Sequence, residues 1–470
     1  MNTPHIRDFQ GGHIHMIGIG GSSMSGLARM LKAQGYRITG SDNLETYATR
    51  SLRDEGIPVT IGHRPENVHG ADLVAFTIAI LPDNPERLEV ARLALPAIER
   101  ATLLGQLMEG AKVAIGVCGT HGKTSTTSML AQALVEAGTD PSVHIGGSLD
   151  FIGGSTRIGK GDVFLTEACE FNASFLHLRP TVAVITNIEE DHLDFYRDID
   201  DIKQAFGKFF DLLPQDGYAI GNGDDDHVTQ LLSTLDCNVY TYGMGEQCDF
   251  RPGQLQYDEQ GRGAFDVLLH GVPIGHVVLK VAGFFHVYNA LATVACAYTQ
   301  GADLPRVCAA LGEFVGAHRR FELTGEIDGV RLYHDYGHNP TEMRNVLSVA
   351  KLQPHNRLWA VMQPHTYSRV KRLFPDYLTC TRDADITLVT DIYAAREKDP
   401  GDIKAAQIVE GMLRNGIQAI HTPSFDDTEQ YLRAHWQPGD LVLTMGCGNI
   451  DQLNEQMHAH EAENAAVQQE

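Results

Sequence analysis

The stretch GVCGTHGKTSTT, residues 116–127, decides the fold class because it joins a short apolar run to a glycine turn and a helix-forming segment. The P-loop pattern G-x-x-x-x-G-K-[ST] would require glycine at position 117, where this chain has Val117. The pattern present, G-[ST]-x-G-K-[ST], predicts a shorter loop whose backbone N–H groups point at phosphate oxygens. The alternative is an ordinary turn with a solvated lysine. We expect a nucleotide-binding loop made by Gly119, Thr120, His121, Gly122, Lys123, Thr124 and Ser125.

Several polar residues near this loop suit phosphate and metal chemistry. Lys123 can neutralise the β- and γ-phosphate oxygens, and the Thr124 hydroxyl can ligate Mg²⁺. Glu167 follows the apolar run DVFLT, and His192 follows TVAVIT, so both are expected at strand ends beside the loop. Hard oxygen ligands with one imidazole suit Mg²⁺ that bridges phosphate oxygens. A buried structural histidine is the alternative for His192. The neighbouring acids stay without an assigned role because acidic loops are usually solvated: Glu170, Glu189, Glu190, Asp191 and Asp194.

Short apolar runs alternate with helix-length segments, and this rhythm starts three times. The runs are 13–20, 36–42 and 71–77; then 112–119, 162–168 and 181–187; then 330–337, 357–363, 384–393 and 439–446. Strands separated by helices predict α/β domains with mainly parallel sheets and sites at the carboxyl ends of strands. We expect a Rossmann-like domain, a P-loop domain and a second Rossmann-like domain, over residues 1–107, 108–315 and 316–470. Shorter, alternating strands are expected within 237–282, and a fraying helix at 459–470.

Composition excludes several classes of protein. The 470 residues include 37 Lys and Arg against 60 Asp and Glu, a net charge of −23, which argues against nucleic-acid binding. The eight cysteines show no CxxC or zinc spacing and indicate a reducing compartment. No signal-peptide pattern opens the chain, and no run of roughly 18 apolar residues occurs. We therefore expect a soluble cytoplasmic protein without membrane insertion.

A second glycine cluster, GIGGSSMSG at 18–26, lies between an apolar run and a helix-forming segment. The dinucleotide fingerprint would place its third glycine at position 23, where the chain has Ser23. Asp42 ends the next apolar run, where a ribose-binding acid would lie. The cluster predicts phosphate binding but leaves the nucleotide open, and a tight turn without a ligand is the alternative.

The last third of the chain gathers cationic residues near predicted strand ends. They lie in GAHRRFELTGE (316–326), HDYGHNPTE (334–342) and QPHTYSRVKR (363–372). Such groups suit the carboxylates and phosphates of ligands. Lys371 and Arg372 are interpreted as a solvated helix face.

Together these residues resemble the Mur ligases of bacterial cell-wall synthesis. The similarity covers nearly the whole chain, and its motifs follow the family's order: HIHMIGIGGSSMSGLA, GTHGKTST, TEACEFNASFLHLRP, TNIEEDHLDFY, RRFELTGE, HDYGHNPTE, QPHTYSR and GDLVLTMGCGNI. The resemblance implies an N-terminal domain for a UDP-sugar, a central ATPase domain and a mobile C-terminal domain. Within the family it points to the member that uses ATP and Mg²⁺ to join L-alanine to UDP-N-acetylmuramate.

The resemblance also implies roles for residues at matching positions. The catalytic residues would be Lys123, Glu167 and His192, and the metal ligands Thr124, Glu167 and His192. The UDP-sugar would be bound by Gly18, Gly20, Gly21, Ser22, Ser23, Met24, Ser25 and Asp42. ATP would be bound by the central loop with Asn289, Arg320 (less surely Arg319) and Asp335. The amino acid and the muramoyl carboxylate would be bound by Tyr336, His338, His365 and Arg369.

Five positions depart from the family's patterns. Cys169 in EACE replaces an acid of the usual EADE, and GFFHVYN places Phe285 and His286 where G-x-H-N-x-x-N has His and Asn. Thr366 stands where many relatives have arginine. Sister ligases use a carbamylated lysine about fourteen residues after the metal-binding histidine, and here Phe206 occupies that position. This last departure implies activity without bicarbonate.

The chemistry implied is amide ligation through an acyl phosphate. A carboxylate held in line with the γ-phosphoryl group is activated, and an amine then attacks the acyl carbon. One alternative is the murein-recycling ligase, which joins a tripeptide to the same sugar nucleotide. Another is a nucleotide-gated binding or regulatory protein without ligase turnover. A dehydrogenase interpretation of residues 13–42 leaves the central loop unexplained.

Overall fold

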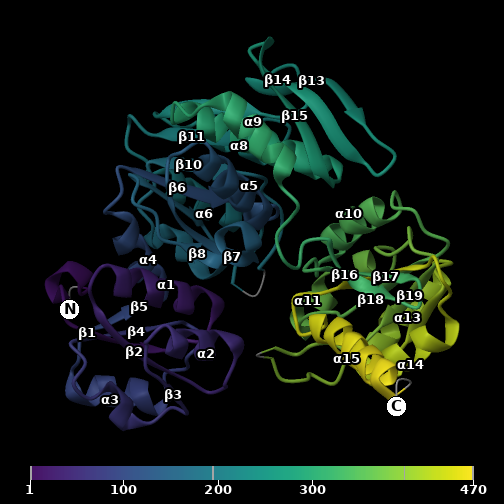
Figure 1. Ribbon diagram of the computed structural model, residues 1–470, viewed down its shortest axis with the longest axis horizontal. Helices are drawn as coiled ribbons and strands as arrows, with labels where there is room; N and C mark the ends of the chain where they lie inside the picture. The colour runs from purple at the N-terminus through teal and green to yellow at the C-terminus, as the bar shows by residue number, and fades with distance from the viewer. Residues whose placement is uncertain (1–2, 193–194, 396, 468–470) are drawn as a thin grey trace. The chain divides into compact units, whose positions relative to one another are not determined.

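Three sheets organise the chain in the computed structural model, which describes residues 3–192, 195–395 and 397–467 (Figure 1). The sheets have five, ten and six strands, and most neighbouring strands run parallel. The predicted α/β class with three mainly parallel sheets is therefore confirmed. The chain forms two compact units: Met1–Gly253 with Asp266–His276 and Tyr288–Leu311, and Gln254–Phe265 with Val277–Val287 and Gly312–Glu470. Within the described residues, no helix combines the length and apolarity that crossing a membrane requires.

The first sheet is entirely parallel and has the order β3-β2-β1-β4-β5. The order reverses between β1 and β4, which is where open α/β sheets bind ligands. The glycine cluster at 18–26 lies at this point, directly after β1. The elements are η1 (Ile6–Phe9), β1 (His13–Ile17), α1 (Ser22–Ala33), β2 (Arg37–Asp42), α2 (Tyr47–Asp54), β3 (Val59–Ile61), η2 (Pro65–Val68), β4 (Leu73–Phe76), α3 (Pro85–Leu93), β5 (Ala97–Glu99) and α4 (Arg100–Met108).

The second sheet has the order β15-β14-β13-β12-β11-β10-β6-β9-β7-β8, with β6 between the parallel strands β10 and β9. Its elements are β6 (Val113–Cys118), α5 (Lys123–Glu136), β7 (Ser142–Leu149), η3 (Asp150–Ile152), β8 (Gly154–Arg157), β9 (Val163–Glu167), η4 (Phe171–His177), β10 (Val182–Ile185), α6 (Ile199–Phe210), β11 (Tyr218–Asn222), α7 (Asp226–Leu232), β12 (Asn238–Tyr242), β13 (Phe250–Tyr257), β14 (Arg262–Leu269), β15 (Val272–Ala282), α8 (Phe284–Thr299) and α9 (Leu304–Glu313).

The expectation of shorter strands within 237–282 is wrong. β13 and β14 have eight residues each and β15 has eleven, against six in β6. Only two residues, His270 and Gly271, connect β14 to β15, and both have positive φ, as a tight hairpin requires. A hairpin needs no crossover helix, so its strands can extend further than those of βαβ units. The expected alternation is present, since buried and more exposed residues alternate along β14.

The third sheet has the order β16-β17-β21-β18-β19-β20, with only β16 antiparallel to its neighbour. Its central strands β17, β18 and β21 are buried on both faces, as parallel strands covered by helices are. The elements are β16 (Glu322–Ile327), β17 (Val330–Asp335), α10 (Pro340–Ala350), β18 (Leu358–Met362), α11 (Tyr367–Arg372), α12 (Phe374–Tyr377), β19 (Ile386–Val389), α13 (Ala405–Arg414), β20 (Ala419–His421), α14 (Phe425–His435), β21 (Leu441–Met445) and α15 (Asp451–Val467).

Helix α4 follows the last strand of the first sheet and packs closely on η4 of the second. A Cβ at Gly105 of α4 would lie 2.0 Å from the backbone oxygen of His177. One hydrophobic cluster includes Leu104 and Leu107 of α4 together with Phe175 and Leu178 near η4. Gly105 is therefore required for a close backbone approach within the first compact unit.

We predict that Gly105→Ala lowers stability, although alanine favours helices over glycine by about 1 kcal/mol. The clash is with backbone, so the expected cost is about 1–3 kcal/mol. The matched control is Gly207→Ala in the interior of α6, where the nearest atom to a new Cβ lies 4.0 Å away. Chemical denaturation should show a lower midpoint for Gly105→Ala and an equal or higher one for Gly207→Ala. Equal midpoints for Gly105→Ala and the parent would contradict the close approach.

Candidate functional site

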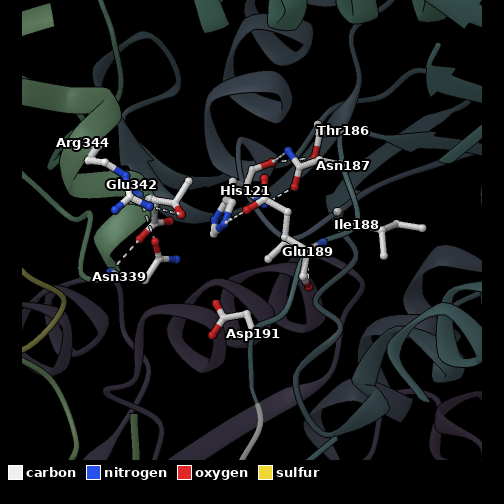
Figure 2. Close-up of polar contacts among 12 residues, drawn as sticks. His121, Thr186, Asn187, Ile188, Glu189, Asp191, Asn339, Glu342 and Arg344 are labelled. Atoms are coloured by element: carbon white, nitrogen blue, oxygen red, sulfur yellow. Dashed lines mark hydrogen bonds and ion pairs between the residues drawn. The ribbon is translucent and has the colours of Figure 1, made fainter. Parts of the chain in front are cut away.

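The central glycine loop connects β6 to α5 in a conformation that needs its glycines. Gly119 and Gly122 have φ of 126° and 83°, values that L side chains rarely adopt. A Cβ at Gly119 would lie 2.0 Å from the Thr186 hydroxyl oxygen. Figure 2 shows how the segment after β10 supports the loop: the Asn187 side chain accepts from the His121 N–H (2.9 Å) and donates to its carbonyl (3.1 Å). The loop is therefore fixed before any ligand contact.

The Lys123 ammonium makes three contacts at the first residue of α5. It donates to the carbonyl oxygens of Gly119 (2.6 Å) and Thr120 (3.0 Å) and to Glu170 Oε1 (2.9 Å). Burial alone would lower the pKa of Lys123, but the negative charge of Glu170 raises the pKa well above its usual value. Lys123 is thus a protonated cation inside the loop, and the solvated-lysine alternative does not describe it.

Two of the predicted metal ligands lie against glycines of β7. Glu167, the last residue of β9, accepts from the Gly146 N–H at 2.8 Å. A Cβ at Gly146 would lie 3.0 Å from Glu167 Oε2, and one at Gly147 would lie 3.0 Å from Thr124 Cγ2. The absence of side chains at these two glycines leaves room for Thr124 and Glu167 beside the loop.

His192 lies close to Glu170, the carboxylate that accepts a hydrogen bond from Lys123. Its Nε2 is 3.6 Å from Glu170 Oε1, and its ring is 4.9 Å from the Phe171 ring. The predicted acid Asp194 lies outside the described residues. Phe206, at the position of the carbamylated lysine in sister ligases, is fully buried and packs edge-on against Phe175.

This donor set fits Mg²⁺ rather than a transition metal. Among the residues that the structure describes, no group of three or more His, Cys, Asp or Glu could hold a metal ion by itself. Mg²⁺ usually takes only one or two carboxylates and completes its octahedron with water and phosphate oxygens. The Thr124 hydroxyl, the Glu167 carboxylate and the His192 imidazole are suitable for that partial role. Glu170 Oε2 is buried without a hydrogen-bond partner in the described chain, which leaves one more oxygen for a ligand.

Asn289, which the resemblance assigns to ATP binding, is buried in α8, near the departing residues Phe285 and His286. The Asn289 amide oxygen accepts from the Thr126 hydroxyl at 3.1 Å, which ties α8 to α5. A Cβ at Gly122 would lie 3.3 Å from the same oxygen. Burial lowers the pKa of His286 to about 3, so this histidine is neutral. The ring of Phe285 lies 4.6 Å from the His286 ring.

The first glycine loop is held by β2. The backbone N–H groups of Gly18 and Ile19 donate to the Ser41 carbonyl oxygen (2.8 and 3.0 Å). Asp42 Oδ2 accepts from the Gly20 N–H at 2.9 Å, and Oδ1 accepts from the Leu44 N–H at 3.3 Å. Both carboxylate oxygens of Asp42 therefore bind backbone, which makes this acid a support for the loop.

The remaining residues of this cluster belong to α1 or its N-cap, Gly21. Met24 is part of the hydrophobic core, and the Ser25 hydroxyl donates to the Ser22 carbonyl oxygen at 3.1 Å. The Ser23 hydroxyl lies 2.8 Å from His144 Nε2 on β7, a contact across 121 residues. Position 23, where the dinucleotide fingerprint has glycine, thus connects the first sheet to the second.

In the second compact unit, Asp335 ends β17 and is nearly buried. Its Oδ1 accepts from the Gly337 N–H (2.6 Å) and its Oδ2 from the Phe321 N–H (2.8 Å). Burial raises the pKa of Asp335 to about 6, although the positive charge of Arg320 opposes the shift. This carboxyl is poised to change its charge just below neutral pH.

A row of cationic and aromatic side chains starts beside Asp335. The guanidinium groups of Arg319 and Arg320 lie 4.9 and 5.1 Å from the Tyr336 ring centroid. The rings of Tyr336 and His338, and then of His338 and His365, are 5.9 Å apart. Arg369 Nη1 completes the row at 3.2 Å from His365 Nδ1. The structure therefore brings the residues assigned to the amino acid and muramoyl carboxylate, Tyr336, His338, His365 and Arg369, into one row with Arg319 and Arg320, which were assigned to ATP phosphates.

Three further residues belong to these clusters but were not assigned from sequence. Glu170 pairs with Lys123, and Tyr393 stacks on His365 at 5.6 Å. Glu342 accepts from the His338 N–H at 3.0 Å and forms a capping box with Asn339, as Figure 2 shows for the latter pair. The N-P-T-E spacing could have predicted this cap. Glu170 is the last acid of the EACE motif, but the motif does not show that its partner is Lys123, and no local pattern marks Tyr393.

Comparison with known proteins defines the class of this site. The Mur ligase family, catalytic domain, matches residues 13–112; the Mur ligase middle domain matches 117–297; and the Mur ligase, glutamate ligase domain, matches 319–448. The chain belongs to the Mur ligase family.

Individual relatives show which Mur ligases this chain resembles. The UDP-N-acetylmuramate–L-alanine ligase of Caldanaerobacter subterraneus subsp. tengcongensis is 44% identical over 442 residues, which are 94% of this chain and 96% of that protein. The enzyme of the same name from Alkaliphilus metalliredigens is 43% identical over 438 residues, 93% and 95% of the two chains. The crystal structure of UDP-N-acetylmuramate-alanine ligase from Thermotoga maritima has a TM-score of 0.82 at 27% identity, covering 96% of this chain and 100% of its own.

We predict a pH-dependent difference in stability between the parent and Asp335→Asn. The folded pKa of Asp335, about 6, lies above roughly 3.9 in an unfolded chain, so its contribution is complete below about pH 4 and is lost as the pH rises through 6. The stability of the parent relative to Asp335→Asn should fall by about 2–3 kcal/mol from pH 4 to pH 7. Chemical denaturation at several pH values measures this; a pH-independent difference would refute the raised pKa.

Proposed function

We infer that this chain is an ATP-dependent ligase that joins L-alanine to the carboxylate of UDP-N-acetylmuramate in peptidoglycan precursor synthesis. The main support is the glycine loop at the start of α5, which holds a protonated Lys123 against Glu170, the carboxylate that His192 also approaches. The L-alanine ligases that resemble this chain over nearly its whole length support the substrates. We place the enzyme in the cytoplasm, since its eight cysteines without CxxC or zinc spacing indicate a reducing compartment.

The first half-reaction activates a carboxylate. The loop N–H groups and the Lys123 ammonium bind the β- and γ-phosphates of ATP and stabilise the charge that moves with the γ-phosphoryl group. The muramoyl carboxylate attacks the γ-phosphorus in line, the bond from that phosphorus to ADP breaks, and an acyl phosphate and ADP form. Mg²⁺, held by Thr124, Glu167 and His192, would neutralise phosphate oxygens and orient the carboxylate. The loop carbonyls and Glu170 hold the ammonium at the loop, and one of its three N–H groups turns from these acceptors to a phosphate oxygen when ATP binds.

The second half-reaction uses the row of cationic and aromatic residues. His338, His365 and Arg369 can bind a single α-carboxylate, and Tyr336 between two arginines is fixed by their guanidinium groups. The amine of the bound amino acid attacks the acyl carbon, and phosphate leaves. Arg320 and Asp335 are assigned to ATP binding.

The remaining assignments are part of the same proposal. The loop after β1 and the first turn of α1 bind the UDP-sugar, with Asp42 supporting the loop rather than contacting ribose. Asn289 supports the ATP loop from α8. The three domains are divided near residues 107 and 315.

Replacing Lys123 with alanine should abolish turnover while UDP-sugar binding stays nearly intact. The ammonium is needed where phosphoryl charge develops, so the loss of kcat should reach at least about 10²–10³-fold. Coupled release of ADP and equilibrium binding of UDP-N-acetylmuramate are the two measurements. The matched control is Lys208→Ala on the last turn of α6. If Lys123→Ala releases ADP at near-parental rates, the loop is not the ATP site.

L-Alanine should be the preferred amino acid, with glycine and L-serine as weaker substrates. A pocket distinguishes a methylene group by only about 1–3 kcal/mol, so small analogues should react with reduced kcat/KM. Phosphate release with UDP-N-acetylmuramate and each candidate, without added bicarbonate, measures this. Faster turnover with a diaminopimelate tripeptide would support the recycling ligase instead. ADP release independent of any amino acid would support a nucleotide-gated binding protein.

A further inference from the structure

Glu170 is the least explained group in the central site. Its side chain is 4% exposed, and its two oxygens differ: Oε1 accepts from the Lys123 ammonium at 2.9 Å, and Oε2 has no partner in the described chain. An unpaired buried carboxylate oxygen costs stability. The presence of Glu170 despite this loss of stability suggests that the residue has a role other than packing.

The backbone around Glu170 is built to hold it in place. The Tyr196 hydroxyl donates to the Glu170 carbonyl oxygen at 2.6 Å. Two residues further on, Asn172 and Ala173 both have positive φ (53° and 52°), a strained conformation for residues other than glycine. Such strain persists only where surrounding contacts enforce it. These contacts direct the Glu170 side chain to Lys123, 47 residues earlier in the chain.

We propose that Glu170 is a positioning residue for Lys123: it holds the ammonium between the carbonyl oxygens of Gly119 and Thr120 and so fixes the cation that receives the phosphates. This inference rests on the proposed function, since it assumes that Lys123 binds nucleotide phosphates. An ammonium has three donors, and here each donor has its own acceptor. Three acceptors fix the orientation of the Lys123 ammonium, whereas a single carboxylate contact would not.

The arrangement has two opposing effects on the reaction. The carboxylate orients Lys123 for the transition state, and it also reduces the net positive charge that the bound nucleotide meets. Removing the charge of Glu170 should therefore tighten ground-state nucleotide binding and slow turnover. If the Glu170 side chain only supported the fold, its replacement would not tighten nucleotide binding and slow turnover together.

The experiment compares Glu170→Gln with the parent. The direct measurement is ADP binding by calorimetry, first with EDTA and then with Mg²⁺. We expect ADP to bind roughly 3- to 10-fold tighter in both conditions, while kcat falls about 10- to 100-fold. The matched control is Glu136→Gln, the same substitution on an exposed residue at the other end of α5, which should change neither value.

A second variant keeps the test decisive if Glu170→Gln does not fold. Glu170→Asp retains the charge but withdraws the carboxylate by one methylene, so ADP affinity should stay parental while kcat falls. Unchanged or weaker ADP binding by Glu170→Gln overturns the proposal, as does parental kcat in Glu170→Asp. Tightening that appears only with Mg²⁺ also overturns it, because Glu170 would then act on the metal. ADP binding needs neither sugar nor amino acid, so these outcomes are separate from a failure of the proposed ligase activity.

Discussion

The buried ion pair between Lys123 and Glu170 connects the parts of the central site. Through it, the loop between β6 and α5 meets the segment after β9, and His192 from the segment after β10 lies within 3.6 Å of the same carboxylate. A protonated lysine can be buried only if a partner offsets the cost of removing it from water. Because Glu170 supplies that partner, the cation can stay inside a loop whose glycines bring backbone close to a phosphate.

The three sheets share a second constraint at the carboxyl ends of their strands. Asp42, Glu167 and Asp335 each end a strand, and each accepts a hydrogen bond from the backbone N–H of a glycine in a nearby segment. An acid in this position fixes the glycine segment at the sheet edge and leaves N–H groups and cations to meet the substrates, while Glu167 would also hold Mg²⁺. This division suits a chain with a net charge of −23 whose substrates are all anionic or zwitterionic.

Much of this architecture follows from local sequence. The central strands β6, β10, β17 and β21 are short apolar runs, three of them closely followed by glycine, and could be placed to within two residues. The row from Tyr336 to Arg369 could be grouped because its motifs follow strands of one sheet. The role of Glu170 could not be predicted, since an acid in an acidic loop shows no sign of its distant partner. The Ser23–His144 contact could not be predicted for the same reason, because the two residues are distant in sequence. The length of β13–β15 could not be predicted either, because these strands are not joined by a crossover helix and β14 turns into β15 through a hairpin.

The central claim is that the carboxylate of the sugar nucleotide is activated as an acyl phosphate before L-alanine attacks. The most direct test uses UDP-N-acetylmuramate labelled with ¹⁸O in its lactyl carboxylate, with ATP and L-alanine, and mass analysis of the phosphate released. The account predicts that each phosphate carries one carboxylate oxygen, which is ¹⁸O, since the carboxylate oxygen that attacks phosphorus leaves with it. Unlabelled phosphate, with the lost carboxylate ¹⁸O released as water instead, would contradict it.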